Sequence, residues 1–300
     1  MTTASMTATT LTGAGTAEFD VSRRTSSGVR TPWATLILTG AIGGVLSGLF
    51  AIGGAIVMVP LLVWRAGMDQ RRAAATSLVA IIPTAVVGYG GKQFMNFMSI
   101  KTWDGDGAWT TNYSGLAVSS DNGETWGVYP GTIRRPEAGN EKFQMGAFLK
   151  PGPGDPYLYT YGTPSGRSGS AYVARVAPAL VPDLTKYEYW SSNADAWVPA
   201  NPAAATAVIP GPVGEMSAQY NSYLKQYLVL YTNRANDVVM RTAPAPQGPW
   251  GPEQTLVSSF FTPGGVYAPF LHPWSTGKNL YYNLSLWSAY NVMLMRTVLP

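Results

Sequence analysis

The stretch Ser119-Ser-Asp-Asn-Gly-Glu-Thr-Trp126 decides the fold of this chain. Its spacing, S-x-D-x-G-x-x-W, is that of the tight β-hairpin turn called an Asp-box. We expect Asp121 to accept hydrogen bonds from the turn backbone, Gly123 to take a positive φ angle and Trp126 to pack beneath the hairpin. Asp121 is therefore predicted to be a structural turn residue, with a catalytic role as the alternative.

Short strands and turns continue on both sides of this hairpin and favour a β-propeller. From Phe94 onward, apolar runs alternate with turn residues, and no segment has the period of an amphipathic helix. A strand ending in Arg recurs at positions 175, 241 and 296, at intervals of 66 and 55 residues. A four-stranded blade takes about 40–50 residues with short loops. The sequence predicts an all-β fold, an incomplete β-propeller of about four blades with the first incomplete. A β-sandwich is the alternative.

The N-terminal third has a different composition. Residues 1–32 are rich in Thr, Ser, Ala and Gly and are predicted to form a disordered tail. No charged residue occurs in the 32 positions from Trp33 to Trp64, and a second uncharged run of 19 residues covers 73–91. A bilayer core needs about 20 apolar residues in a helix. We therefore predict a short α-helical transmembrane or re-entrant segment over 33–91 that contacts the lipid bilayer. A buried soluble hairpin is the alternative.

Residues 92–300 form the predicted propeller domain, and their charge is nearly balanced. They carry 14 Lys and Arg against 13 Asp and Glu, which argues against a nucleic-acid partner. The whole chain has no Cys and one His, His272. That composition excludes a thiolate metal site and a cysteine nucleophile, and argues against a His-based metal centre. We predict no metal and no other cofactor, so any catalysis in this domain has to use carboxylates.

The uncharged segment resembles a transporter family. Gly40, Gly44 and Gly48 form overlapping GxxxG motifs that allow close helix packing. Together with the stretches 44–61, 75–78 and 84–88, they make residues 36–91 similar to the first repeat of TauE/SafE-type sulfite exporters. This resemblance implies a fragment of an anion transporter.

Several stretches of the propeller domain together carry a family resemblance. They are Asn96–Ser99, Phe143–Gly146, Glu188–Trp190, Gly211–Asn221, Arg241–Trp250, Ala268–Trp274 and Leu286–Asn291. With these stretches, residues 94–299 resemble an actinobacterial family of domains of unknown function, whose members are associated with endo-D-arabinanase activity. The resemblance implies a five-bladed propeller and a glycoside hydrolase. The resemblance also implies a propeller that is truncated at its N-terminal end.

A glycosidase needs two carboxyl groups about 5–9.5 Å apart. Glu215 is the candidate general acid, because it lies in the apolar stretch around Gly214 and Met216. A carboxylate held by nearby backbone amides is the alternative. Asp104 is the candidate partner, with an ordinary turn residue as the alternative. Glu188, between two tyrosines, is a third candidate.

Sugar rings are bound by aromatic platforms and by side chains that hydrogen-bond to hydroxyl groups. Each aromatic residue alone is more often part of a core, and a buried structural histidine is the alternative for His272. The predicted substrate-binding residues are Arg167, Trp190, Gln219, Tyr220, Tyr267, His272, Trp274, Trp287 and Tyr290.

Three function hypotheses follow. The first is a membrane-tethered glycoside hydrolase that acts on the cell-wall D-arabinan of arabinogalactan or lipoarabinomannan. The second is a carbohydrate-binding or inactive propeller, and the third is a remnant of a sulfite or sulfonate transporter in a fused reading frame. Arg23, Arg24 and Arg30 favour a cytoplasmic N-terminus, since positive flanks stay inside. One net crossing then places the propeller outside the cell membrane, facing the cell wall, and this is the prediction. Two crossings, which leave the propeller in the cytoplasm, are the alternative.

Overall fold

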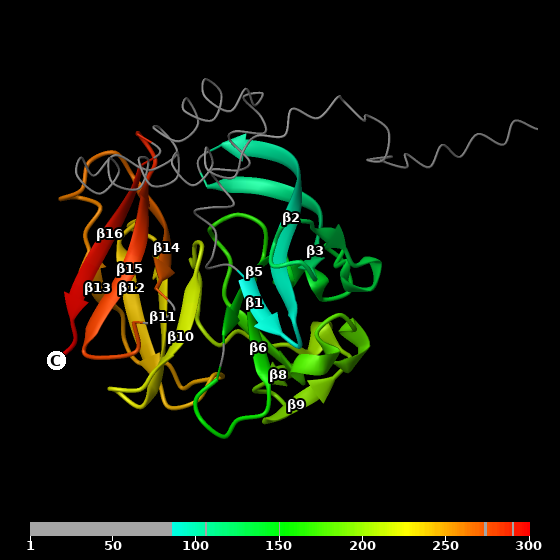
Figure 1. Ribbon diagram of the computed structural model, residues 1–300. Helices are drawn as coiled ribbons and strands as arrows, with labels where there is room; N and C mark the ends of the chain where they lie inside the picture. Colours follow the sequence, from blue (N-terminus) through cyan, green and yellow to red (C-terminus); the bar gives the residue numbers. More distant parts are fainter. Residues whose placement is uncertain (1–85, 106, 150, 273–274, 290) are drawn as a thin grey trace, which may run out of the picture.

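The computed structural model describes residues 86–105, 107–149, 151–272, 275–289 and 291–300 (Figure 1). They form four antiparallel sheets, which follow one another in sequence order. Neighbouring sheets contact each other: β2 contacts β5, β5 contacts β10, and both β10 and β11 contact β14. This arrangement confirms an all-β fold and a propeller-like set of four blades.

The first two blades contain four and five strands. The first blade consists of β1 (Val86–Tyr89), β2 (Lys92–Gly105), β3 (Ala108–Ser119) and β4 (Gly127–Val128). The second consists of β5 (Met145–Leu149), β6 (Leu158–Thr163), β7 (Tyr172–Val176), β8 (Glu188–Ser191) and β9 (Ala196–Pro199).

The other two blades contain four and three strands. The third blade consists of β10 (Ser217–Asn221), β11 (Gln226–Thr232), β12 (Val238–Ala243) and β13 (Gln254–Val257). The fourth consists of β14 (Val266–Leu271), β15 (Asn279–Leu286) and β16 (Asn291–Val298). Short 3₁₀ turns connect the strands at η1 (Pro130–Thr132), η2 (Asn140–Phe143), η3 (Pro178–Leu180), η4 (Leu184–Lys186) and η5 (Pro202–Ala204).

Three details differ from the sequence predictions or fall outside the structure. The first blade has four strands, so in the described part of the chain the blade with fewest strands is the last, not the first. Strand β1 lies inside the run 73–91 and pairs with β2, Tyr89 opposite Lys92, so the propeller begins before residue 92. Predictions for the tail and for 33–85 concern residues outside the described ranges. Within the described residues, no helix is long and apolar enough to cross a bilayer.

The Arg repeat marks the third strand of a blade. Arg175 lies on β7, Arg241 on β12 and Arg296 on β16. Each of these strands pairs with an aromatic-containing strand, β6, β11 or β15. The repeat read from the sequence therefore corresponds to the repeat of the fold.

The core consists of three apolar clusters between successive blades. The sequence of strand β11, QYLVLYT, has no polar face, and its place between two blades explains this. Val229 and Tyr231 face the cluster shared with the second blade, and Leu228 and Leu230 face the cluster shared with the fourth. Because successive side chains of a strand point to opposite faces, a strand with a blade on each side is apolar at every position.

The Asp-box turn has the predicted contacts. Asp121 Oδ1 accepts hydrogen bonds from the Ser119 hydroxyl (2.7 Å) and from the Thr125 amide (2.9 Å), and Oδ2 accepts one from the Thr125 hydroxyl (2.6 Å). Gly123 has a φ of 90°, and the Trp126 indole N–H donates to the Gly123 carbonyl. Led by those from Thr125, these hydrogen bonds lower the pKa of Asp121 to about 2. Asp121 is thus a structural turn residue.

Candidate active site

A cavity of about 280 Å³ lies where the first three blades meet. Strand β2, the segment leading into β5, the end of β6 and the segment before β10 supply its lining. The lining residues are Asn96, Phe97, Met98, Gln144, Met145, Gly146, Thr163, Glu215 and Met216. A Cβ atom on Gly146 would lie 1.8 Å from Asn96 Nδ2, so the closeness of β5 to β2 depends on this glycine.

Glu215 is held in place by the backbone around it. The Gly214 N–H donates to the Thr232 carbonyl at 2.9 Å, and the Val213 N–H donates to the Gly169 carbonyl at 2.9 Å. A Cβ atom at position 214 would come within 2.1 Å of Thr232 Oγ1. A side chain at position 214 would therefore have to displace the Thr232 side chain, and glycine lets the segment before Glu215 pack closely on β11.

The two carboxylate oxygens of Glu215 have different surroundings. Oε1 accepts hydrogen bonds from Arg167 Nε at 3.0 Å and Nη2 at 2.8 Å. Oε2 is buried and accepts no hydrogen bond from any residue that the structure describes. About a quarter of each side chain of the ion pair is exposed. The carboxylate is therefore anchored by one oxygen, while the other is buried and has no partner among the described residues.

Arg167, in the loop after β6 of the second blade, contacts residues of the other three blades. Its backbone N–H donates to the Gly107 carbonyl at 2.9 Å, which attaches the loop after β6 to the β2–β3 turn. Its guanidinium carbon lies 5.8 Å from the ring centroid of Tyr267 on β14, within cation–π range. The Tyr267 ring in turn meets Trp287 edge-on, at 5.7 Å between centroids, and Trp287 is 57% exposed. Four predicted site residues thus form a continuous path from the cavity to the surface.

The polar side of the cavity contains residues that were not singled out from the sequence. Gln144 is fixed, since its Oε1 accepts from Thr111 at 2.6 Å and its Nε2 donates to the backbone carbonyls of Arg134 and Asn140. Thr163 is 1% exposed, and its Oγ1 has no hydrogen-bond partner within the described ranges. Gln144 belongs to a stretch that carries the family resemblance. Thr163 has no comparable signal.

The other predicted substrate-binding residues lie elsewhere. Gln219 and His272 are neighbours, with Gln219 Nε2 donating to the His272 carbonyl at 3.4 Å. Tyr220 packs on Tyr227, and Trp190 packs on Trp197, both against the apolar cluster between the second and third blades. None of these four predicted residues lines the cavity. Trp274 and Tyr290 lie outside the described residues.

The structure does not bring Asp104 to the cavity wall. Asp104 lies in the exposed end of β2, where its carboxylate accepts a hydrogen bond from the Thr102 hydroxyl at 2.9 Å. Glu188 is paired with Arg175 at 2.7 Å on the second blade. Among the residues that the structure describes, Glu215 is thus the one carboxylate lining the cavity, and no group of three His, Asp or Glu residues is placed to bind a metal.

The fold and this cavity define a β-propeller domain with a carboxylate at the meeting point of its blades. The chain belongs to the family described as Domain of unknown function (DUF4185), whose model matches residues 64–296. The model of a second family, Sulfite exporter TauE/SafE, matches residues 3–109. The two matches overlap over β1 and β2.

Similar proteins come from fungi and bacteria. Notoamide biosynthesis cluster protein J' of Aspergillus versicolor is 29% identical over 205 residues, which cover 66% of this chain and 54% of that protein. The chain thus spans about half the length of this relative. An α-L-arabinanase from Cellvibrio cellulosa, solved with arabinohexaose, is 12% identical with a TM-score of 0.45, covering 70% of this chain and 71% of its own. An α-L-arabinofuranosidase from Clostridium thermocellum is 12% identical with a TM-score of 0.46, covering 71% and 67%.

Proposed function

We propose that this protein is a glycoside hydrolase that acts on cell-wall D-arabinan, with the sugar bound in the cavity at Glu215. The observation that carries the proposal is that Glu215 lines a cavity of about 280 Å³ while its Oε2 is buried without a hydrogen-bond partner among the described residues. A buried polar atom without a partner is costly, and a sugar hydroxyl that donates to Oε2 removes this cost.

The other lining groups suit a sugar as well. Small-molecule sites combine apolar walls with a few placed polar groups, in volumes that start at about 300 Å³. Here Phe97, Met98 and Met145 supply the apolar wall, and Thr163 supplies a second buried oxygen without a partner within the described ranges. Tyr267 and Trp287 continue the path outward as aromatic platforms. This combination supports a polysaccharide whose chain extends from the cavity to the surface.

The ion pair with Arg167 suggests which role Glu215 has in hydrolysis. The sequence favours Glu215 as the general acid. A carboxylate with a guanidinium bonded to one oxygen is suited instead to the role of nucleophile or base, with the second oxygen reacting. In that case the proton donor is a second carboxyl group.

Binding without hydrolysis is the second candidate function. It is favoured by the finding that Glu215 is the one carboxylate on the cavity wall in the described part of the chain. Glycosidases use a pair of carboxyl groups about 5–9.5 Å apart. A domain with one of the two still binds the sugar but leaves the glycosidic bond intact.

A membrane location completes the proposal. The TauE/SafE match over 3–109 and the uncharged runs of the sequence support a segment within 33–91 that is embedded in the cell membrane, with the propeller facing the wall. The same match supports a third candidate, a sulfite or sulfonate transporter remnant, which vesicle uptake of labelled sulfite by the full chain tests.

One experiment separates the first two candidates. The purified full chain and its Glu215→Gln variant are incubated with arabinogalactan, and released reducing ends and bound polysaccharide are measured in parallel. Release by the wild type and not by the variant supports hydrolysis. Binding without release supports the second candidate, and neither binding nor release rejects both.

A further inference from the structure

The loop between β13 and β14 exposes two adjacent phenylalanines. Phe260 and Phe261 are 83% and 82% exposed, more than any other large apolar residue in the described ranges. Their rings meet edge to face at 5.1 Å between centroids. The loop, residues 258–265, contains no charged side chain. Such exposed aromatic pairs have no role in the core and mark a contact with something else.

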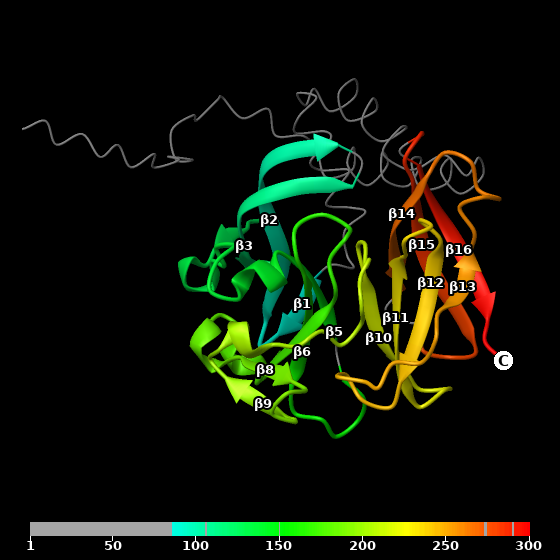
Figure 2. The same cartoon turned by 180° about the vertical axis from the view of Figure 1, so that it is seen from behind.

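This loop is tied to a second uncharged turn. The Trp287 N–H donates to the Gly265 carbonyl at 2.7 Å, and the Ser288 N–H donates to the Gly264 carbonyl at 2.8 Å. Trp287 is therefore held beside the phenylalanine loop. We call Phe260 and Phe261 the aromatic tip. The β13–β14 loop and the β15–β16 turn lie at the same end of the molecule, as both views show (Figures 1 and 2).

The base of the loop is fixed by hydrogen bonds to the third blade. The Ser259 N–H donates to Asp237 Oδ1 at 2.7 Å, and the Ser259 hydroxyl donates to the Ala235 carbonyl at 2.7 Å. The phenylalanines are thus presented on a loop that is already ordered. A surface that inserts a preformed loop loses little conformational freedom on binding.

We propose that the aromatic tip inserts into the interface of the lipid bilayer in which the N-terminal part of the same chain is anchored. The uncharged run from Trp33 to Trp64 puts a bilayer within reach of the propeller. Phe partitions into the acyl boundary of the interface, and an uncharged loop carries no ion to desolvate. Insertion fixes the orientation of the propeller on the membrane. The inference rests on the proposed membrane location but not on hydrolysis.

A spin label tests the proposal in the full chain. The chain has no Cys, so a single introduced cysteine is labelled without background. Thr262→Cys places a nitroxide beside Phe261, and Ala194→Cys, in the exposed turn between β8 and β9, is the matched control. Both are reconstituted at one chain per nanodisc of phosphatidylcholine and phosphatidylglycerol. We expect the label at 262 to be shielded from aqueous nickel–EDDA and open to oxygen, and the label at 194 to show the reverse.

The double substitution Phe260→Ser and Phe261→Ser, in the Thr262→Cys background, is expected to abolish the shielding while leaving the melting temperature unchanged. Flotation of the chain with vesicles reports the N-terminal anchor separately. A chain that floats but leaves position 262 as accessible to nickel–EDDA as position 194 overturns the insertion. A chain that does not float overturns it as well. Shielding that persists without lipid shows self-association instead and also rejects the proposal.

Discussion

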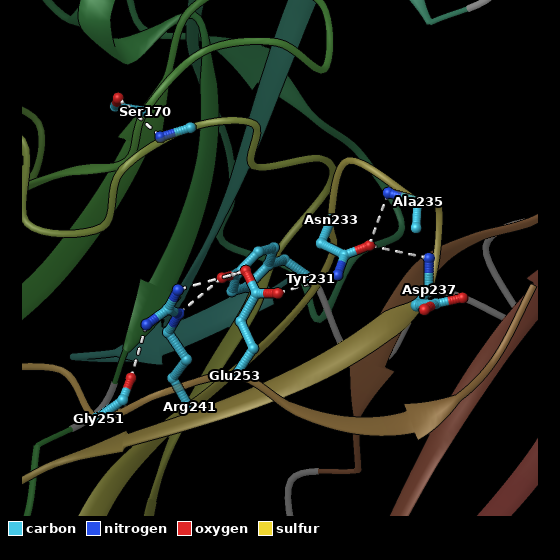
Figure 3. A network of polar contacts seen from close by, with 9 residues as sticks. Ser170, Tyr231, Asn233, Ala235, Asp237, Arg241, Gly251 and Glu253 are labelled. Carbon is cyan, nitrogen blue, oxygen red and sulfur yellow. Dashed lines mark hydrogen bonds and ion pairs between the residues drawn. The ribbon is translucent and has the colours of Figure 1, made fainter.

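Two Arg–Glu pairs of this protein differ in whether both carboxylate oxygens accept hydrogen bonds. On the third blade, Glu253 Oε1 accepts from the Tyr231 hydroxyl at 2.8 Å and from Arg241 Nη2 at 3.3 Å, and its Oε2 accepts from Asn233 Nδ2 at 2.9 Å (Figure 3). Arg241 bonds the same Tyr231 oxygen at 2.7 Å and the Gly251 carbonyl at 2.6 Å. At the cavity, by contrast, Arg167 occupies one oxygen of Glu215 and leaves the other without a partner among the described residues.

The comparison separates a structural pair from a site. We call the Glu253 network closed because both carboxylate oxygens accept hydrogen bonds. It joins β11, β12 and the segment before β13 within one blade. Burial raises the pKa of Tyr231 to about 12. Burial alone would raise the pKa of Glu253, but hydrogen bonds from Asn233 and Tyr231 and the charge of Arg241 together lower it. The Glu215 pair joins different blades and lies at a cavity wall, and one of its carboxylate oxygens has no partner among the described residues.

The largest expected effect is on the open carboxylate. Glu215→Gln is expected to lower the rate of arabinan hydrolysis by about 100-fold or more, the usual loss when a positioned acid or base is removed. Its stability is expected to change by less than about 1 kcal/mol, since the pair is partly exposed. Initial rates of reducing-end release and urea unfolding measure the two quantities. Glu253→Gln is the matched control and should retain the rate. Equal losses of activity in both variants would contradict the assignment of Glu215 to a site and of Glu253 to a structural pair.

The closed network is expected to show the opposite pattern. Tyr231→Phe removes a hydroxyl that bonds both Arg241 and Glu253, and hydrogen bonds to charged groups contribute about 1.5–3 kcal/mol. We expect a loss of that size in the free energy of unfolding, with hydrolysis unchanged. The control is Tyr282→Phe, because the Tyr282 hydroxyl has only a 3.3 Å contact with Thr297. An equal loss in both variants would show that the network adds nothing beyond burial of the ring.

A smaller effect is expected from the buried threonine of the cavity. Thr163→Val removes an oxygen that has no partner among the described residues, so stability should stay within about 1 kcal/mol. If the hydroxyl bonds the sugar, binding of arabinan weakens roughly 3- to 10-fold, as for one neutral hydrogen bond. Thr160→Val is the control, because its Oγ1 is also buried without a partner but does not line this cavity. Isothermal titration with an arabinan oligosaccharide measures both, and identical affinities would contradict the assignment.

The fold could be predicted further than the site, for a physical reason. The Asp-box and the Arg repeat are short-range patterns, since the turn contacts of Asp121 span four residues and Arg175 marks a strand by itself. The contact between Arg167 and Glu215 spans 48 residues and depends on how two blades pack. The sequence therefore indicated Arg167 and Glu215 as separate candidates but did not predict the contact between them.

The aromatic residues show the same limit. In a propeller, strands are apolar on both faces, so the sequence does not distinguish a platform from a core residue. Trp190 and Tyr220 were predicted to bind sugar and pack against a core cluster, whereas Trp287 is exposed beside Tyr267. Which blade lies next to each strand decides the difference, and that is a property of the assembled fold.

The smallest expected effect concerns a second closed carboxylate, Asp121 of the Asp-box. Its pKa is about 2 in the folded state, against 3.8 ordinarily, because Thr125 and Ser119 hydrogen-bond to the ionised form. A lowered folded pKa contributes stability that is present above about pH 4 and is lost as the pH falls toward 2. Asp121→Asn lacks this contribution. The melting temperature of the wild type should therefore exceed that of the variant at pH 5–7 and converge with it near pH 2.

The acid titration of Asp121 sharpens the comparison because the same test applies to any carboxylate whose oxygens are both occupied. Glu124→Gln, on an exposed neighbour in the same turn, is the control and should leave the pH dependence of the melting temperature unchanged. If Asp121→Asn instead melts at the wild-type temperature from pH 7 to pH 2, its hydrogen bonds do not hold the turn. A closed carboxylate would then be no evidence of a structural role, and the distinction between Glu253 and Glu215 would rest on the cavity alone.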